Sequence, residues 1–320
     1  YVLLHHAMGD VDGNVGSWVF ARGGMGSVAA ALSSSFQSLG GEIRTNSEVN
    51  QIIVDGKTAK GVQLVSGEII RANAVVSNLD AKRTFLKLID EKKLPSELSE
   101  KARNFKIRGS SGKVNIALDG MPIFSALPKK SPLTLGHMHF SDTLERLERA
   151  YDDWKDDRWS ADPYVDMVIP TQYDPTMAPP GKHMMSVFVQ YCPVSPEGGW
   201  DEKKKKQFGN TVINQIADYS PNFKDLILHA EIRTPHEIEK EVGLTEGNIF
   251  QGELTLDQLM FNRPFPGYAQ YRGPFKKMYM CSSSNHPGGG VMGAPGANAA
   301  REILRDLKLQ NTTPEDFGDD

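Results

Sequence analysis

The stretch Lys277-Met-Tyr-Met-Cys-Ser-Ser-Ser-Asn-His-Pro-Gly-Gly-Gly-Val-Met-Gly-Ala-Pro-Gly296 decides how this chain folds. It begins with the apolar residues of a buried strand and leads into an alanine-rich helix. Its five glycines between positions 288 and 296 leave the backbone unshielded and free to adopt positive φ. The N–H groups at the start of the helix suit a ligand edge that is anionic or rich in acceptors.

The same glycines have a plainer interpretation, which this segment alone leaves open. A turn between a buried strand and a surface helix also uses glycine, for close packing. Short glycine motifs recur by chance, so the choice between the two interpretations depends on the surrounding sequence.

A second glycine-rich segment, Phe20-Ala-Arg-Gly-Gly-Met-Gly-Ser27, predicts a tight entry to a helix over residues 25–39. Apolar residues of that helix repeat at helical spacing, namely Val28, Leu32, Phe36 and Leu39. Gly40-Gly41 is a typical helix end. Asp55-Gly56 and Ser66-Gly67 then indicate hairpins between short strands, predicted at 42–44, 48–54, 58–65 and 68–76.

These segments resemble the phytoene desaturase-like FAD-dependent oxidoreductases of the FAD/NAD(P)-binding flavoprotein superfamily. The resemblance extends through Tyr173–His183, Gly247–Phe250 and Leu256–Leu259 and is most specific at Tyr271–Arg301. It implies a hydride transfer to flavin from an apolar or amine-bearing small molecule, with the backbone of Val49 beside the adenine. The implied cofactor-binding residues are Gly24, Met25, Val49, His286, Pro287, Gly288, Gly289, Gly290, Val291, Gly293, Ala294, Pro295 and Gly296.

The chain departs from the family pattern just before His286. Relatives usually carry a glycine-rich or Gly-Asp sequence there, whereas this chain has Ser282-Ser-Ser-Asn285. The Asp that often holds the ribityl chain of the flavin is therefore absent, and Asn285 or a serine hydroxyl is its alternative. Two further functions stay open: a flavin amine oxidase-type enzyme, and a flavoprotein-derived binding or regulatory domain without turnover.

No Gly-x-Gly-x-x-Gly follows a predicted strand and precedes an acidic residue about 20 positions later. We therefore expect the C-terminal part of a longer protein, lacking the N-terminal Rossmann unit. The predicted fold is α+β, an α/β-like flavin lobe remnant plus a mixed-sheet substrate lobe. Residues 1–100 and 271–310 are the predicted cofactor domain, 101–270 the substrate-binding domain, and 311–320 a disordered tail.

Within the predicted substrate domain, apolar runs separate into strands and helices by their length and period. The strands are predicted at 113–119, 133–140, 166–170 and 184–190, and the longer helices at 142–156 and 201–219. The stretch Leu259–Phe265 is either core or the wall of an apolar tunnel.

Composition narrows the possible partners and compartment. A net charge of −4 gives no basic face for nucleic acid, so a small-molecule substrate is the expected partner. No apolar run is long enough to cross a bilayer, which leaves peripheral membrane contact and the oligomeric state open. The only two cysteines, Cys192 and Cys281, lie far apart and lack the Cys-x-x-Cys spacing of redox-active disulfides. This composition is typical of a protein in a reducing compartment such as the cytoplasm or the mitochondrial matrix.

Histidines are the main candidates for chemistry. His137 and His139 share one face of a strand, but no Cys, Asp or Glu partner is near in sequence, so we predict structural histidines and no metal. His286 either faces the flavin or bonds to backbone carbonyls, and His5-His6 is either a loop feature or faces substrate. Hydride transfer needs mainly geometry, and the sequence assigns no catalytic base.

We predict that this chain alone does not retain FAD, because the missing segment would supply the pyrophosphate cradle. The visible absorbance spectrum of the purified 320-residue chain checks this. A stoichiometric flavin spectrum would contradict it.

Overall fold

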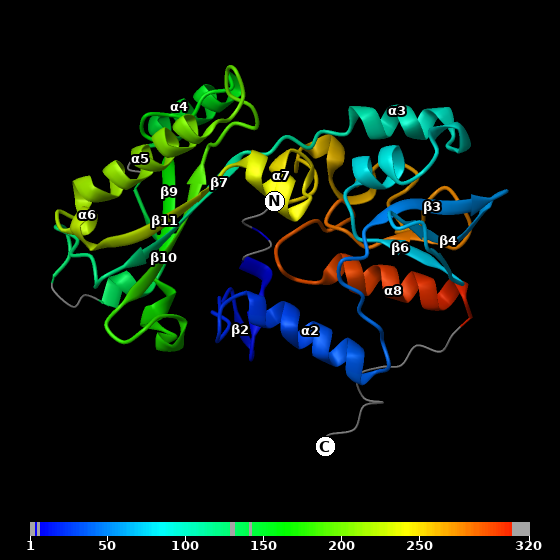
Figure 1. Ribbon diagram of the computed structural model, residues 1–320, viewed down its shortest axis with the longest axis horizontal. Coiled ribbons are helices and arrows are strands. Elements are labelled where there is room, and N and C mark those ends of the chain that lie inside the picture. The colour runs from blue at the N-terminus through cyan, green and yellow to red at the C-terminus, as the bar shows by residue number, and fades with distance from the viewer. Residues whose placement is uncertain (1–3, 5–6, 129–131, 141–142, 309–320) are drawn as a thin grey trace. The chain divides into compact units, whose positions relative to one another are not determined.

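The computed structural model describes residues 4, 7–128, 132–140 and 143–308 (Figure 1). Two compact units make up the chain: unit 1 consists of residues 1–43 and 109–247, and unit 2 of residues 44–108 and 248–320. Both combine helices with sheet, as the predicted α+β class requires. The predicted division into cofactor and substrate domains stays a prediction. His5-His6 and the predicted tail at 311–320 lie outside the described residues.

Unit 1 is built on a five-stranded sheet in the order β11-β7-β10-β9-β8, with every pair antiparallel (Figure 1). Its strands are β7 (Ser111–Leu118), β8 (Met138–His139), β9 (Tyr164–Val168), β10 (His183–Gln190) and β11 (Ile227–Arg233). The predicted strand over 133–140 is too long, because a 3-10 turn occupies Pro132–Leu135 and Gly136 follows it.

Buried and more exposed side chains alternate along the strands, so the sheet has one apolar, buried face and one polar face. Val114, Ile116 and Leu118 of β7 are fully buried, and the residues between them point to the opposite face. Phe208 and Val212 of helix α5 (Glu202–Tyr219) belong to the same core, since they recur at helical spacing. The helix therefore covers the apolar face and leaves the polar face of the sheet to other contacts.

The remaining helices and strands of unit 1 lie outside this sheet. Helix α4 is anchored by Trp154, whose Nε1 donates to the carbonyl of Gly109 at 3.1 Å. A capping box of Thr234 and Glu237 starts α7, where both side chains satisfy free N–H groups. These elements are β1 (Asp10–Val11), β2 (Asn14–Val15), α2 (Gly26–Ser38), α4 (Leu144–Lys155), α6 (Phe223–Leu226) and α7 (Pro235–Val242).

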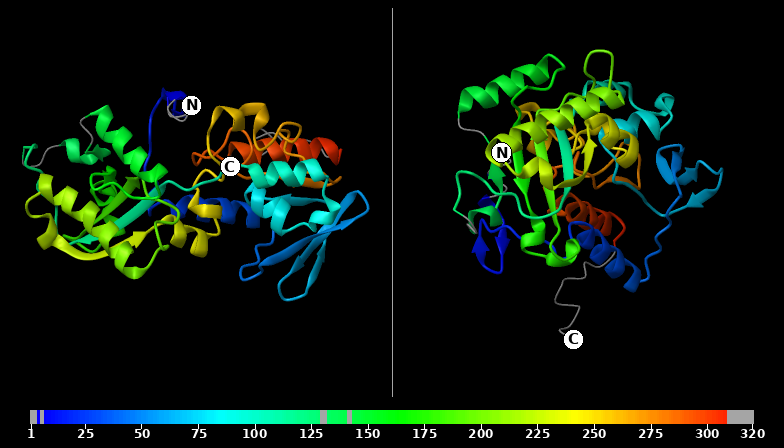
Figure 2. Two further views of the ribbon diagram at one scale, coloured as in Figure 1. Left: turned by 90° about the horizontal axis from the view of Figure 1, so that it is seen from above. Right: turned by 60° about the vertical axis from the view of Figure 1, so that its left-hand side comes forward.

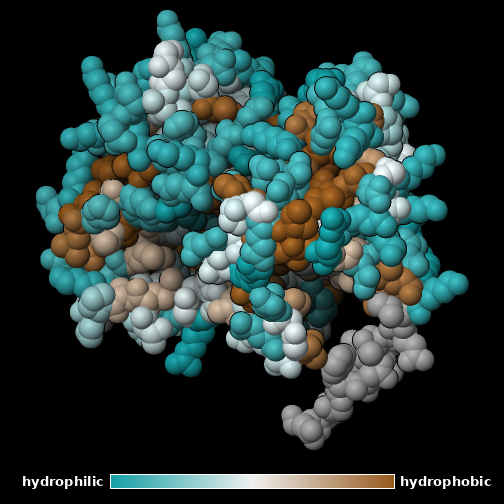
Figure 3. All heavy atoms as spheres, turned by 45° about the vertical axis from the view of Figure 1, so that its right-hand side comes forward, coloured by the Kyte–Doolittle hydropathy of each residue, from teal (hydrophilic) through white to brown (hydrophobic). Residues whose placement is uncertain are grey.

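Helix α2 agrees with its predicted position, but its apolar stripe is not buried. Leu32 and Phe36 are 69% and 51% exposed, and no residue of α2 is fully buried. The space-filling view shows further apolar side chains, in brown, at the surface (Figure 3). Helical spacing predicted the helix correctly, and the repeat specifies a face of the helix but not what covers it.

Unit 2 contains the predicted meander, although the strand predicted at 42–44 does not form, and the chain then returns to a parallel strand pair (Figure 2). Strands β3 (Val49–Asp55), β4 (Thr58–Leu64) and β5 (Ile69–Arg71) are antiparallel, and β6 (Val75–Ser77) pairs in parallel with β12 (Met278–Met280). Helices α3 (Ser96–Asn104) and α8 (Ala294–Asp306) complete the unit. Its core joins Phe85 and Phe105 to Phe265, rings that lie 6.0 Å and 5.4 Å from Phe265.

The two cores allow a stability test confined to unit 1, because all four tryptophans, Trp18, Trp154, Trp159 and Trp200, belong to it. Phe208→Ala removes a fully buried ring from under the sheet and should lower the free energy of unfolding by about 3–5 kcal/mol. Denaturant titration followed by tryptophan fluorescence measures this value. Leu144→Ala, at a side chain 80% exposed, is the control, and an equal loss in both variants would contradict the proposed core.

Candidate cofactor site

The glycine-rich segment at 277–296 and the residues after it fold as a buried strand, a glycine loop and a helix. All three residues of β12 are buried, and α8 begins after Gly293, which takes a left-handed conformation with φ +65°. Pro295 lies in the first turn of the helix, where its missing N–H costs no hydrogen bond. The predicted order of strand, loop and helix is therefore confirmed.

The backbone conformation of the loop requires glycine at two positions. Gly288 and Gly290 have φ angles of +100° and +136°, a region that other residues rarely adopt. At Gly288 a Cβ atom would also meet Leu254 Cδ2 at 3.4 Å and Arg263 Nε at 3.6 Å. Only glycine at position 288 can therefore combine this backbone conformation with so close an approach to Arg263.

The glycines do not all present the same surface. A Cβ atom on Gly289 would lie 3.1 Å from Phe250 Cδ1, so this position faces protein. A Cβ atom on Gly296 would meet nothing within 4 Å, and the residue is exposed in the first turn of α8. A side chain added at Gly289 would therefore disturb the packing of Phe250. A side chain added at Gly296 would contact no protein atom and would affect only a ligand bound at the start of α8.

The serines before the loop bond to neighbouring protein groups. Ser284 Oγ donates to the carbonyl of Gln251 and accepts from the N–H of Ala81, while Ser282 Oγ accepts from the N–H of Ser284. The N–H of Ser283 donates to Gln251 Oε1 at 2.9 Å. These contacts hold the turn, which leaves Asn285 as the better candidate for the role of the missing Asp.

Asn285 is fully buried, and neither its Oδ1 nor its Nδ2 has a hydrogen-bond partner among the described residues. Its backbone is paired, because its N–H donates to Ser282 and its carbonyl accepts from the N–H of Gly288. A buried amide without partners costs about 1–3 kcal/mol, so it is rare unless a ligand or water satisfies it. Asn285, directly before the glycine loop, therefore fits a polar cofactor such as FAD.

The most extensively bonded side chain near the loop is one that the sequence did not reveal. Arg263 is fully buried and donates hydrogen bonds of 2.8–3.3 Å to backbone carbonyls, those of Phe250, Gly252, Glu253, Gln258 and Ser283. It lies in the stretch Leu259–Phe265 that we interpreted as core or tunnel wall. A charged residue inside an apolar run was the available signal, because buried arginine requires partners.

Helix α8 is tied to the same scaffold. Tyr271 Oη donates to the carbonyl of His286 at 2.8 Å and accepts from Asn298 Nδ2 at 2.9 Å. At the far end of the helix, Arg272 binds Asp306 and Glu302 and holds the pKa of Asp306 below its usual value. Tyr271 thus ties the start of the loop to the first half of α8, and Arg272 ties the end of α8 to the segment before β12. His286 itself is half-buried.

The other predicted cofactor residues divide between the units. Val49 opens β3 in unit 2 and pairs with Leu64. Gly24 and Met25 lie in unit 1 at the start of α2, where Gly24 has φ +84°. The N–H of the preceding residue, Gly23, donates to Asp174 Oδ2 and lowers the pKa of that carboxyl group, as does Thr176. Their contact with a cofactor stays a prediction.

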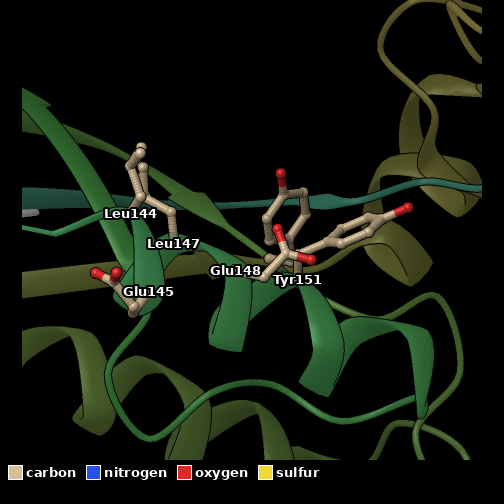
Figure 4. Close-up of a pocket in the computed structure, with 6 residues that line it drawn as sticks. Leu144, Glu145, Leu147, Glu148 and Tyr151 are labelled. Atoms are coloured by element: carbon tan, nitrogen blue, oxygen red, sulfur yellow. The ribbon is translucent and has the colours of Figure 1, made fainter.

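Two surface cavities do not include any predicted cofactor residue. The larger, of about 540 Å³, lies on α4 in unit 1, and Figure 4 shows its lining side chains. These are Leu144, Glu145, Leu147, Glu148, Tyr151 and Tyr191. The smaller, of about 330 Å³, lies in unit 2 beside Phe105 and Phe265. Among the described residues there is also no metal-suited group of three His, Cys, Asp or Glu side chains.

A model of the family described as flavin containing amine oxidoreductase matches residues 4–304. The chain belongs to this family. It is 40% identical over 318 residues to the pyridine nucleotide-disulfide oxidoreductase domain-containing protein 2 of Rattus norvegicus, and the match covers 96% of the chain and 55% of the relative. A lycopene-forming phytoene desaturase of a Paracoccus species is 25% identical, with coverage of 96% and 58%. The resemblance to phytoene desaturase-like oxidoreductases is confirmed.

Solved structures support the fold. Cyclohexylamine oxidase from Brevibacterium oxydans aligns with a TM-score of 0.54 at 14% identity, over 95% of this chain and 57% of that one. The flavoprotein fold is thereby confirmed. The chain spans little more than half the length of the curated relatives described above. No helix among the described residues has the length and apolar character needed to cross a membrane.

The contacts of Arg263 lead to a test of the loop scaffold. Arg263→Met leaves buried carbonyls without donors and should destabilise unit 2 by on the order of 3 kcal/mol. Hydrogen–deuterium exchange should then accelerate in peptides covering 250–258 and 282–290. Arg301→Met, at an exposed arginine of α8, should leave these peptides unchanged. Unaltered exchange in Arg263→Met would show that the guanidinium does not hold the loop.

Proposed function

We propose that this chain forms one wall of the FAD site of an oxidoreductase that takes a hydride from an apolar or amine-bearing small molecule. The observation that carries the proposal is Asn285, a buried amide without protein partners beside a loop that only glycine can form. Its carbonyl and amide groups suit the hydroxyls and acceptor atoms of FAD. FAD supplies the hydride-accepting chemistry when bound, and the chain supplies the binding surface.

The start of α8 adds an electrostatic contribution. The first-turn N–H groups of a helix have no intrahelical acceptor, and the helix dipole places partial positive charge at that end. Gly293 and Gly296 carry no side chain that would cover these groups. This helix end is therefore suited to stabilise negative charge that develops on the pyrimidine edge of a reduced flavin.

The relatives support two substrate classes. Cyclohexylamine oxidase and lycopene-forming phytoene desaturase are named for an amine and for an apolar polyene precursor, respectively. An amine oxidase-type reaction is therefore the alternative within the enzyme class. A non-catalytic binding or regulatory domain is the second candidate function, favoured by the departure at Ser282–Asn285 from the usual family sequence.

The cysteines fit hydride chemistry rather than thiol chemistry. Burial raises the pKa of the Cys192 thiol and of the Cys281 thiol, so neither is activated as a thiolate. We propose accordingly that the partner is a small-molecule substrate and that the protein works in a reducing compartment, cytoplasmic or like the mitochondrial matrix.

The proposal predicts that Gly296→Val in the full-length protein lowers FAD affinity about tenfold, equal to about 1.4 kcal/mol, because its side chain projects where the cofactor would lie. Folding should be unaffected, since nothing lies within 4 Å of the new Cβ atom and valine is a better helix former than glycine. Flavin absorbance after dialysis against known FAD concentrations measures the affinity. Ala300→Val, one turn further along the same exposed face, is the matched control.

Equal FAD affinity in both variants would contradict the proposed position of the cofactor. A colourless full-length protein that cannot be reconstituted with FAD would instead favour the binding-domain alternative. If FAD is bound, anaerobic bleaching by n-alkylamines or by isoprenoid hydrocarbons distinguishes the two substrate classes.

A further inference from the structure

The outer margin of the unit 2 meander carries a cluster of cations without acidic partners. Strand β5 is the last strand of the β3-β4-β5 sheet, and no described segment pairs with its outer side. Other basic residues of unit 2, such as Arg44, Arg103 and Arg272, form ion pairs. Five exposed basic residues at this margin have no ion-pair partner among the described residues, namely Lys57, Lys60, Arg71, Lys276 and Lys277.

Backbone hydrogen bonds hold these residues side by side, although they come from three separate stretches of the chain. The N–H of Ala72, the residue after β5, donates to the carbonyl of Lys60 at 3.1 Å. The N–H of Lys276 donates to the carbonyl of Lys57 at 2.9 Å, and its own carbonyl accepts from the N–H of Ala59 at 3.0 Å. Because β3 occupies the other side of β4, β5 and Lys276 lie along the same side of that strand.

Strand β5 also directs backbone polar groups to this margin. The residues on either side of the strand, Glu68 and Ala72, bond to β4. Antiparallel bonding alternates along a strand, so the N–H and carbonyl groups of Ile69 and Arg71 point away from β4. Ile69 is itself 50% exposed. An exposed sheet edge of this kind is a template to which an extended peptide can add as a further strand.

The charges at the margin favour an acidic peptide. The β3–β4 hairpin contributes one carboxylate, Asp55, against Lys57 and Lys60, so the margin keeps an excess of positive charge on a chain whose net charge is −4. Exposed charges closer together than about 8 Å are screened only in part at physiological salt, so like charges here repel one another. An acidic ligand would relieve this repulsion and would be attracted to the margin.

Other anionic partners satisfy only one of the two features. Nucleic acid binding to single strands uses aromatic rings for stacking, and none of the five cations is accompanied by one on β4 or β5. A lipid surface offers charge but no N–H groups to pair with a sheet edge. An extended acidic peptide satisfies both the free backbone groups and the cations.

We propose that the margin of β5 docks an extended, acidic segment of a partner protein, which adds to the meander as a fourth strand. Main-chain hydrogen bonds to Ile69 and Arg71 align the segment along β5. Its carboxylate side chains pair with Arg71 and Lys60, and the acidic chain beyond the strand meets Lys57 and Lys276.

This docking surface is separate from the proposed cofactor site. Lys276 and Lys277 precede β12, whereas Asn285 and the glycine loop follow it. The two sites therefore lie at opposite ends of the same buried strand. Docking at β5 depends neither on bound flavin nor on any contact with unit 1.

Fluorescence anisotropy of a fluorescein-labelled peptide of Glu-Val repeats tests docking in the full-length protein. The peptide should bind, and its affinity should fall as salt rises from about 0.05 M to about 0.5 M, because exposed charges are then screened. The same peptide methylated at every backbone nitrogen keeps its charge but cannot donate to a sheet edge. It should bind at least about tenfold more weakly, since main-chain hydrogen bonds provide the affinity in strand addition.

Arg71→Gln combined with Lys60→Gln removes two charges that have no partner within the described residues, so the fold should be unaffected. Binding of the Glu-Val peptide should weaken about tenfold, the product of two exposed ion pairs that contribute about threefold each. Lys203→Gln combined with Lys206→Gln makes the same charge change at exposed lysines of α5 and is the matched control. It should leave the affinity unchanged.

Equal affinity for the methylated and unmethylated peptides, or equal weakening by the two double variants, would overturn the proposal. Binding to vesicles that contain phosphatidylserine, without binding of the Glu-Val peptide, would overturn it in favour of a lipid surface.

Discussion

The glycine loop depends on a guanidinium group buried beneath it. Arg263 donates to backbone carbonyls from three separate stretches, residues 250–253, Gln258 and Ser283. Loop backbone that belongs to no strand or helix would otherwise leave these carbonyls unsatisfied in the interior. Because Gly288 passes close to the same guanidinium, the loop adopts its positive-φ path over a rigid support rather than as a flexible connection.

That support explains why the loop can present backbone rather than side chains. The serines at 282 and 284 are occupied by protein partners, and Tyr271 holds the carbonyl of His286. The side chain of Asn285 is also buried in this turn, but its polar atoms have no hydrogen-bond partner among the described residues. A neutral amide in place of a carboxylate also removes a negative charge from the surroundings of the flavin proposed here, which favours accumulation of charge on its reduced form.

Local patterns in the sequence predicted the parts of the fold that local chemistry determines. Hairpin signals at Asp55-Gly56 and Ser66-Gly67 correspond to the turns of the β3–β4–β5 meander, and the glycine segment lies between β12 and α8 as expected. The helical spacing of residues 28–39 predicted α2, but the exposure of its apolar stripe could not be predicted, since periodicity does not identify a partner surface. Arg263 and the pairing of Asp166 with His137 were missed, because both depend on contacts between distant strands and loops.

The surface from Asn285 to the start of α8 is the part of this chain that we propose contacts FAD. Hydrogen–deuterium exchange of the full-length protein, compared with and without FAD, measures this contact directly at peptides covering 284–298. Exchange in these peptides should slow on FAD binding, whereas exchange at the solvent-exposed C-terminal end of α5 should not change. Bound FAD that leaves exchange at 284–298 unaltered would contradict it.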